Sequence, residues 1–196
     1  PHLFSSAASD VYKRQGSVGK QFTSAGIMKM VEENLLRLDE SILKYISDGP
    51  KKWKSITIRH LMTHSSGIPD YTSEEFDYSK NYSEEDLVEM ASKLDLEFSA
   101  GKRWNYSNTG YVLLGVIMSR VAKKPYWEYL DEHIFTPAGM HSIRINTEKN
   151  IVPNKAKGYI PSKEGYQHAS YVAPITNTTA DGSMLLSLED LLAWNS

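Results

Sequence analysis

Residues 16–23 read GSVGKQFT, and they open the segment on which the expected fold depends. From Ser17 to Glu33 there is no proline, and apolar residues recur at roughly helical spacing, which predicts a largely buried helix ending near Asn34. Residues three apart share one helix face, so the Ser17 hydroxyl and the Lys20 amine can reach one another. A serine is a good nucleophile when a neighbouring base takes its proton, and a lysine does this when burial or nearby cations favour its neutral form. The segment therefore predicts a nucleophile, Ser17, and its partner base, Lys20.

The Ser-x-x-Lys spacing is weak evidence by itself. Random placement of 23 serines and 16 lysines in 196 residues gives roughly two such pairs. Ser41 and Lys44 have the same spacing as Ser17 and Lys20. The sequence around each pair has to decide between them.

Several further segments follow Ser17 in order. Residues 60–71 read HLMTHSSGIPDY, residues 106–111 read YSNTGY, residues 134–140 read IFTPAGM and residues 182–194 read GSMLLSLEDLLAW. Together with GSVGKQFT, these segments resemble the serine β-lactamase family, close to the class C enzymes and their DD-peptidase and esterase relatives. The resemblance extends over nearly all of residues 16–196 and implies an α+β, β-lactamase/transpeptidase-like fold.

The resemblance also implies roles for individual residues. Ser17 is expected to be the acylated nucleophile, Lys20 its proton partner and Tyr106 a second proton carrier. Asn108 has one acceptor and two donor positions, so it suits a side chain that orients Lys20 and binds a substrate amide. The Ser17 backbone N–H would give half of the oxyanion hole. Ser41 falls where the family has a variable turn, and we expect a solvated surface residue there.

Tyr106 and Asn108 also have interpretations without catalysis. A phenol with an ordinary pKa of about 10 serves near neutral pH if cations stabilise its phenolate or if it relays a proton, and the sequence leaves both open. Tyr106 could instead be a packed aromatic and Asn108 a helix cap. Their order behind Ser17 favours the catalytic interpretation.

The expected function is that of a serine hydrolase that forms an acyl-enzyme on a β-lactam, a D-alanyl peptide or a small ester. The alternative is a catalytically silent, penicillin-binding-like homologue that binds peptide or cell-wall ligands. Intact Ser17, Lys20, Tyr106 and Asn108 favour the hydrolase. No cofactor is expected, and the expected partner is a small-molecule or peptide substrate.

Composition narrows the class of protein. With 40% hydrophobic and 23% charged residues, the chain has a globular composition. A net charge of −2 without basic clusters gives no indication of a nucleic acid or an anionic membrane as partner. The absence of cysteine excludes disulfides and thiolate sites, and no apolar run approaches the roughly 20 residues of a membrane helix. Compartment and oligomeric state do not follow from these residues, although the resemblance implies a periplasmic or secreted protein.

His60 and His64 lie four residues apart and could share a helix face and a metal ion. A leucine, rather than the glutamate of a zinc-protease signature, follows His60, and no third ligand is evident. We therefore expect no metal site and two imidazoles that brace the loop. Three aromatic residues could either line a substrate cleft or be ordinary packing. They are Trp104, Tyr111 and Tyr71.

Both ends of the chain carry an expectation of their own. Residues 5–15 read SSAASDVYKRQ, which resembles the in-frame translation of a transposase sequencing adapter at all eleven codons. We expect residues 1–15 to be a sequencing artefact and residues 16–196 to be a partial β-lactamase-related serine hydrolase domain. The family's third motif, Lys or His followed two residues later by Gly, should come after Gly182, whereas the nearest string, KEG at 163–165, precedes it. The resemblance thus implies that the chain contains mainly the helical subdomain and the nucleophile helix of the family's fold, with much of the antiparallel sheet missing. Such a piece would expose an apolar face, so we expect it to be poorly soluble or inactive.

Other helices and strands are predicted from capping residues and periodicity. Apolar residues between 110 and 122 predict a buried helix, and β-branched residues at 143 and 145, with 158–160, indicate short strands or loops. The helix-start signals are Thr57 before a helix towards Met62, Ser83 with Asp86, Pro125 before a helix that ends short of Pro137, and Ser187 with Asp190.

Overall fold

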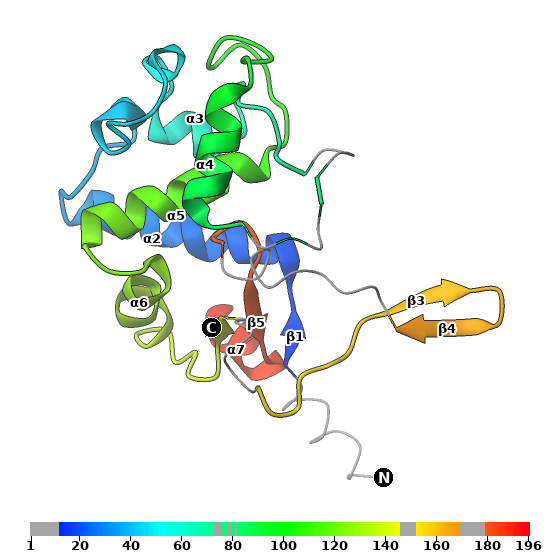
Figure 1. Ribbon diagram of the computed structural model, residues 1–196. Coiled ribbons are helices and arrows are strands. Elements are labelled where there is room, and N and C mark those ends of the chain that lie inside the picture. Colours follow the sequence, from blue (N-terminus) through cyan, green and yellow to red (C-terminus); the bar gives the residue numbers. More distant parts are fainter. Residues whose placement is uncertain (1–11, 73–75, 78–79, 81, 146–151, 169–178) are drawn as a thin grey trace.

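Helices form most of the regular secondary structure, and a small antiparallel sheet lies against them (Figure 1). The computed structural model describes residues 12–72, 76–77, 80, 82–145, 152–168 and 179–196. The helices in this part of the chain are α2 (Lys20–Glu32), α3 (Ile58–Met62), α4 (Glu84–Lys93), α5 (Asn108–Ala122), α6 (Tyr126–Leu130) and α7 (Leu188–Trp194). The shorter helical turns are η1 (Gly16–Gly19), η2 (Ile42–Lys44), η3 (Lys51–Trp53) and the π-helical η4 (Asp131–Phe135).

The strands fall into two separate sheets. β1 (Lys13–Arg14), β5 (Met184–Leu186) and β2 (Arg144–Ile145) form an antiparallel sheet with β5, which is fully buried, in the centre. The pairing of β1 uses main-chain groups alone, so it does not depend on which side chains residues 13 and 14 carry. The mixture of helices and short antiparallel strands confirms the predicted α+β class.

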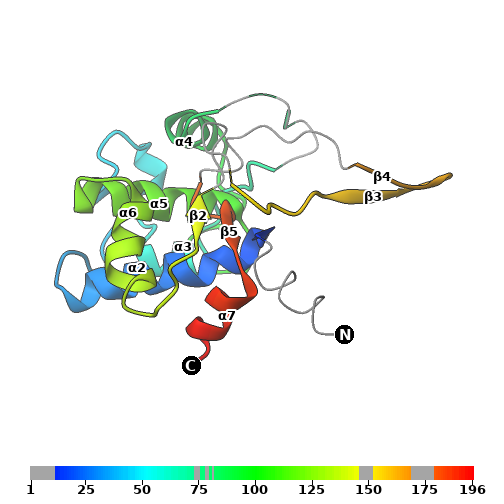
Figure 2. The same ribbon diagram turned by 90° about the horizontal axis from the view of Figure 1, so that it is seen from below.

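The second sheet is a hairpin of β3 (Tyr159–Ser162) and β4 (Gly165–His168). It projects away from the helices in both views (Figures 1 and 2). The KEG string at 163–165 therefore lies at the tip of the hairpin, with exposed side chains, rather than on a strand beside the nucleophile helix.

Helices α2 and α5 lie side by side and form the centre of the core (Figure 1). One face of α2 buries Phe22, Ile27 and Met30. Residues 109–118 of α5 are buried on every side of the helix, as a helix without a polar face must be. No helix within the described residues is long and apolar enough to cross a membrane.

The predicted helix boundaries are confirmed at each signalled position. Capping boxes open α3, α4 and α7, because in each case the N-cap hydroxyl accepts from a backbone N–H and the side chain three residues later accepts from the N-cap N–H. Pro125 immediately precedes α6, which continues through η4 and stops before Pro137. The nucleophile helix ends at Glu32, followed by Asn34 at φ +60°.

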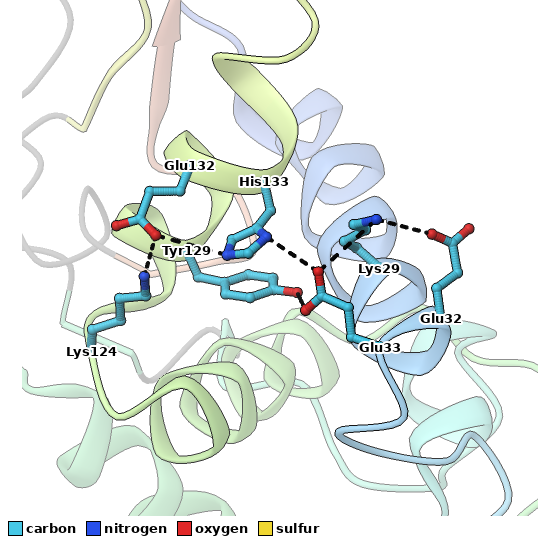
Figure 3. A network of polar contacts seen from close by, with 7 residues as sticks. All are labelled: Lys29, Glu32, Glu33, Lys124, Tyr129, Glu132 and His133. Atoms are coloured by element: carbon cyan, nitrogen blue, oxygen red, sulfur yellow. Dashed lines mark hydrogen bonds and ion pairs between the residues drawn. The ribbon is translucent and has the colours of Figure 1, made fainter.

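The far end of α2 is tied to α6 and η4 by a polar network (Figure 3). Tyr129 Oη donates to Glu33 Oε2 at 2.9 Å, and His133 Nδ1 lies 3.3 Å from Glu33 Oε1. The rings of Tyr129 and His133 stack with centroids 4.2 Å apart. These contacts tie the C-terminal end of α2 to α6 and η4.

Candidate active site

Ser17 lies at the entrance to the nucleophile helix. The helix predicted to start at Ser17 is divided in the structure: η1 is a 3₁₀ turn, and the α-helix begins at Lys20. Side chains at i and i+3 eclipse one another in a 3₁₀ turn, which aligns Ser17 with Lys20 more closely than an α-helix would. The Ser17 side chain is exposed, and its Oγ lies 2.6 Å from Tyr106 Oη. The predicted nucleophile is therefore accessible and already in a hydrogen bond.

Lys20 is buried, with 6% of its surface exposed, and its Nζ has three neighbours. Nζ lies 3.2 Å from Ser17 Oγ, and it donates to Asn108 Oδ1 at 2.7 Å and to the backbone carbonyl of Asp181 at 2.6 Å. A neutral amine has two N–H bonds and one lone pair. If the two shorter contacts take the hydrogens, the lone pair is left in the direction of Ser17 Oγ. The geometry suits a base for the serine.

Asn108 is the first residue of α5, and its neighbour Ser107 is the N-cap, because Ser107 Oγ accepts from Gly110 N–H at 3.3 Å. The interpretation of Asn108 as a helix cap is therefore wrong. Asp70 Oδ2 accepts from both the backbone N–H of Asn108 at 2.7 Å and its Nδ2 at 3.1 Å. These two bonds fix the amide so that its oxygen faces Lys20.

Tyr106 is 37% exposed, and its hydroxyl faces the nucleophile, so it is not merely a packed aromatic. Lys20 Nζ lies 5.1 Å from the centroid of its ring, and the His64 ring lies 4.6 Å from it. His64 also holds the loop that carries Tyr106, because its Nδ1 accepts from Ser107 N–H at 3.2 Å and its carbonyl accepts from Asn105 N–H at 2.9 Å.

Both histidines brace the backbone, as predicted. His60 Nδ1 accepts from Thr57 N–H at 3.2 Å in the capping box of α3. Burial lowers the pKa of both His60 and His64. A neutral ring whose Nδ1 accepts carries its hydrogen on Nε2. Each Nδ1 is thus occupied by a different backbone N–H, and no cluster of metal-ligating side chains occurs within the described residues.

Asp181 was not predicted from the sequence, although it immediately precedes Gly182 in one of the resembling segments. Its backbone lies against the start of the nucleophile helix, where a Cβ on Gly182 would lie 3.0 Å from the carbonyl carbon of Gly16. A Cβ contact this short is tighter than nearly all real ones, so glycine favours this approach. The close packing brings the Asp181 carbonyl to Lys20, and a glycine beside Ser17 and another after residue 181 were the available signals.

The other Ser-x-x-Lys pairs are structural. Ser41 is half-buried rather than a solvated surface residue, because its Oγ caps η2 by accepting from Leu43 N–H at 3.3 Å. Lys44 donates to Glu40 at 2.8 Å instead of approaching Ser41. Ser99 and Lys102 form a third pair of this spacing, with exposed side chains, in a turn closed by Lys102 N–H donating to Ser99 O at 3.1 Å. Within the described residues, Ser17 is the one serine of the three pairs with a lysine amine at its hydroxyl.

The three aromatic residues divide between the core and the surface. Tyr71 and Tyr111 are 6% and 5% exposed and are packing residues whose hydroxyls are hydrogen-bonded. Trp104 is 67% exposed and lies edge-on to His64, with ring centroids 6.1 Å apart. Trp104 is thus the member of the set whose ring is exposed to solvent.

Glu84, the first residue of α4, carries a buried carboxyl close to the Asp181 segment. Its Oε1 has no hydrogen-bond partner within the described residues and faces Gly115 of α5. Burial, followed by the charges of Glu85 and Asp181, raises the pKa of Glu84 to about 7. The folded protein therefore holds a proton on Glu84 at pH values where the unfolded chain has released it.

We expect this proton to make stability depend on pH. Because the pKa of Glu84 is raised from 4.5 to about 7, the contribution of Glu84 to the unfolding free energy should be complete below pH 4.5 and fall as the pH rises towards 7. The loss amounts to about 2–3 kcal/mol. Urea unfolding at pH 5 and pH 8 should show this loss in the wild type and little of it in Glu84→Gln. Glu89→Gln, on the exposed side of the same helix, is the control, and an unchanged pH slope in Glu84→Gln would contradict the assignment.

Comparison with known proteins identifies the family of the chain. A family model described as Beta-lactamase matches residues 14–195. Penicillin-binding protein 4* of Bacillus subtilis (strain 168) is 30% identical over 195 residues, which cover 91% of this chain and 43% of that protein.

Solved structures of related proteins have a similar fold. The D-amino acid amidase from Ochrobactrum anthropi SV3 is similar with a TM-score of 0.84 and 28% identity, over 95% of this chain and 55% of that one. A penicillin binding protein from Bacillus halodurans is similar with a TM-score of 0.83 and 26% identity, over 95% of this chain and 60% of that one. The chain therefore spans about half the length of these proteins.

Proposed function

Since the chain belongs to the beta-lactamase family, we propose that it is part of a serine hydrolase that works through an acyl-enzyme on Ser17. One observation carries the proposal. The amine of Lys20 is held by Asn108 and Asp181 at 2.7 and 2.6 Å, with its remaining direction towards Ser17 Oγ at 3.2 Å. A buried amine oriented in this way is suited to take the serine proton.

The acylation step follows from these contacts. Ser17 Oγ forms a bond to the substrate carbonyl carbon while its proton passes to Lys20 Nζ, and the carbonyl π electrons move to the oxygen. When the tetrahedral intermediate collapses, the bond to the leaving amine or alcohol breaks and that group takes up a proton. In our proposal Tyr106 passes this proton on, which its Oη, 2.6 Å from Ser17 Oγ, is close enough to do. Water then cleaves the ester of Ser17 by the reverse sequence of proton transfers.

The N-terminal ends of two helices can stabilise the negative charge of the tetrahedral intermediate. The first N–H groups of a helix have no intrahelical partner, and the helix dipole places partial positive charge there. Ser17 lies in the turn that leads into α2, and Asn108 opens α5. In our proposal the Ser17 N–H is one oxyanion donor.

The proposed substrate is a β-lactam, a D-alanyl peptide or amide, or a small ester. The relatives named above include penicillin-binding proteins and an amidase for D-amino acids, which supports acyl compounds of this kind. Asn108 gives one amide hydrogen to Asp70, and its Nδ2 carries a second that can bind a substrate carbonyl. The exposed ring of Trp104 offers an apolar contact near the same place.

Covalent labelling of the full-length protein tests the proposal. An alkyl fluorophosphonate or a fluorescent penicillin should add to Ser17, and digestion with trypsin places the adduct. Ser17, Ser41 and Ser99 fall on separate tryptic peptides, which end at Lys20, Lys44 and Lys102. The other two peptides therefore serve as internal controls. Labelling of these peptides to the same extent, or no adduct on the peptide that ends at Lys20, would exclude Ser17 as the nucleophile. A protein that is labelled at Ser17 but does not hydrolyse a p-nitrophenyl ester would favour the silent homologue.

A further inference from the structure

The carbonyl that binds Lys20 belongs to a residue whose own side chain is held from two sides. Asp181 is 7% exposed. Tyr71 Oη donates to its Oδ2 at 2.8 Å, and Thr179 Oγ1 donates to its Oδ1. Within the described residues, no lysine, arginine or histidine forms an ion pair with this carboxylate. Two neutral hydroxyls thus hold a buried carboxylate beside the amine of the site.

The segment around Asp181 is a tight turn. Ser183 Oγ donates to Thr179 O at 2.6 Å, and Ser183 Oγ lies 2.9 Å from Tyr126 Oη. The direction of the Asp181 carbonyl is consequently set by side chains on three elements: the turn itself, α6 and the loop that carries Tyr71. Tyr71 connects the turn to that loop, and the residue before Tyr71, Asp70, holds Asn108.

Two adjacent residues therefore support the two acceptors of Lys20. Asp70 fixes the side-chain oxygen of Asn108, and Tyr71 fixes the carboxylate of Asp181 and with it the backbone carbonyl. Both acceptors have to keep their directions if the lone pair of the amine is to face Ser17 Oγ. Errors of about 1 Å in such an arrangement can cost about 100-fold in rate.

We infer that Tyr71 and Asp181 are positioning residues of the active site, which hold the backbone carbonyl of residue 181 so that the amine of Lys20 faces Ser17. The inference rests on the proposed function for its effect on rate. The geometric part, that the Tyr71 hydroxyl restrains Lys20, does not depend on the substrate.

Tyr71→Phe is the variant that tests it, because it removes one hydroxyl and keeps the ring. The matched control is Tyr129→Phe, which removes a hydroxyl that also donates to a carboxylate, Glu33, at the other end of α2 (Figure 3). In the full-length protein, the maximal rate of fluorophosphonate labelling should fall by about 10- to 100-fold in Tyr71→Phe. The half-saturating probe concentration should stay the same, and Tyr129→Phe should label as the wild type does.

A second measurement does not need catalysis. Trace acetylation of the native protein, followed by peptide mass spectrometry, compares the reactivity of Lys20 with that of Lys44, which pairs with Glu40 outside the network of Figure 3. We expect the Lys20 to Lys44 ratio to rise at least about 5-fold in Tyr71→Phe and in Asp181→Asn, because a less restrained amine is more accessible to the reagent, and to stay unchanged in Tyr129→Phe. An unchanged ratio in both test variants would overturn the inference. Failure of the wild type to label at Ser17 would overturn the proposed function instead, and the acetylation ratio would still decide the positioning role.

Discussion

Replacing Lys20 by methionine is expected to slow the acylation of Ser17 by about 1000-fold, because a general base contributes roughly 100- to 10,000-fold to such a step. This corresponds to about 4 kcal/mol of activation free energy. Methionine fills similar space but offers neither a lone pair of sufficient basicity nor hydrogens for Asn108 and Asp181. The measurement is the second-order rate constant for fluorophosphonate labelling in the full-length protein.

The variant also leaves two buried acceptors without their donor, which costs stability. Each unpaired buried acceptor lowers the unfolding free energy by about 1–3 kcal/mol. Labelling should therefore be measured well below the unfolding temperature of the variant. Lys29→Met is the control on the same helix, where the side chain is partly exposed and pairs with Glu32 at 3.3 Å. It should label at the wild-type rate. A Lys20→Met protein that labels within about 10-fold of the wild type would show that another group takes the proton.

Gly67→Ala is expected to destabilise the protein by about 2–5 kcal/mol, of which about 1–2 kcal/mol comes from the left-handed backbone and about 1–3 kcal/mol from the forced overlap. Gly67 has φ +76°, and a Cβ there would overlap the carbonyl oxygen of Phe98. That oxygen belongs to the backbone, so no side chain can move aside. The same two segments are joined by Glu97 N–H donating to Gly67 O at 2.9 Å. Urea unfolding monitored by circular dichroism gives the free energy.

Gly139→Ala separates the two causes. Gly139 has nearly the same backbone angle, φ +73°, but a Cβ there would have no atom within 4 Å. Its substitution should cost about 1–2 kcal/mol, from the backbone alone. Equal losses in the two variants would mean that the approach of Phe98 contributes nothing.

Local structure was predictable from the sequence where a few neighbouring residues determine it. The capping boxes of α3, α4 and α7 each involve residues three positions apart, so the signals at Thr57, Ser83 and Ser187 were sufficient. The buried helix α5 followed from its apolar composition. The division of the nucleophile segment into a 3₁₀ turn and an α-helix was not predicted, since both patterns place residues three apart on one side.

The site was only partly predictable. Ser17, Lys20, Tyr106 and Asn108 were expected together because of the order of their motifs, and the structure brings their polar atoms within hydrogen-bond distance of one another. Spacing alone could not have selected Ser17, because Ser41 and Ser99 have a lysine at the same offset. What separates them is where each lysine points, and that depends on contacts with residues far along the chain.

By itself, the sequence determined the residue types of the site, their order and the helices that carry them, since these depend on neighbours a few positions apart. Only the tertiary structure decided which groups orient the amine of Lys20. Asn108 and Asp181 lie 88 and 161 positions from it. Asp181 reaches it because Gly182 permits close packing against Gly16. No periodicity or propensity relates residues at such separations, because their contact results from the packing of whole elements.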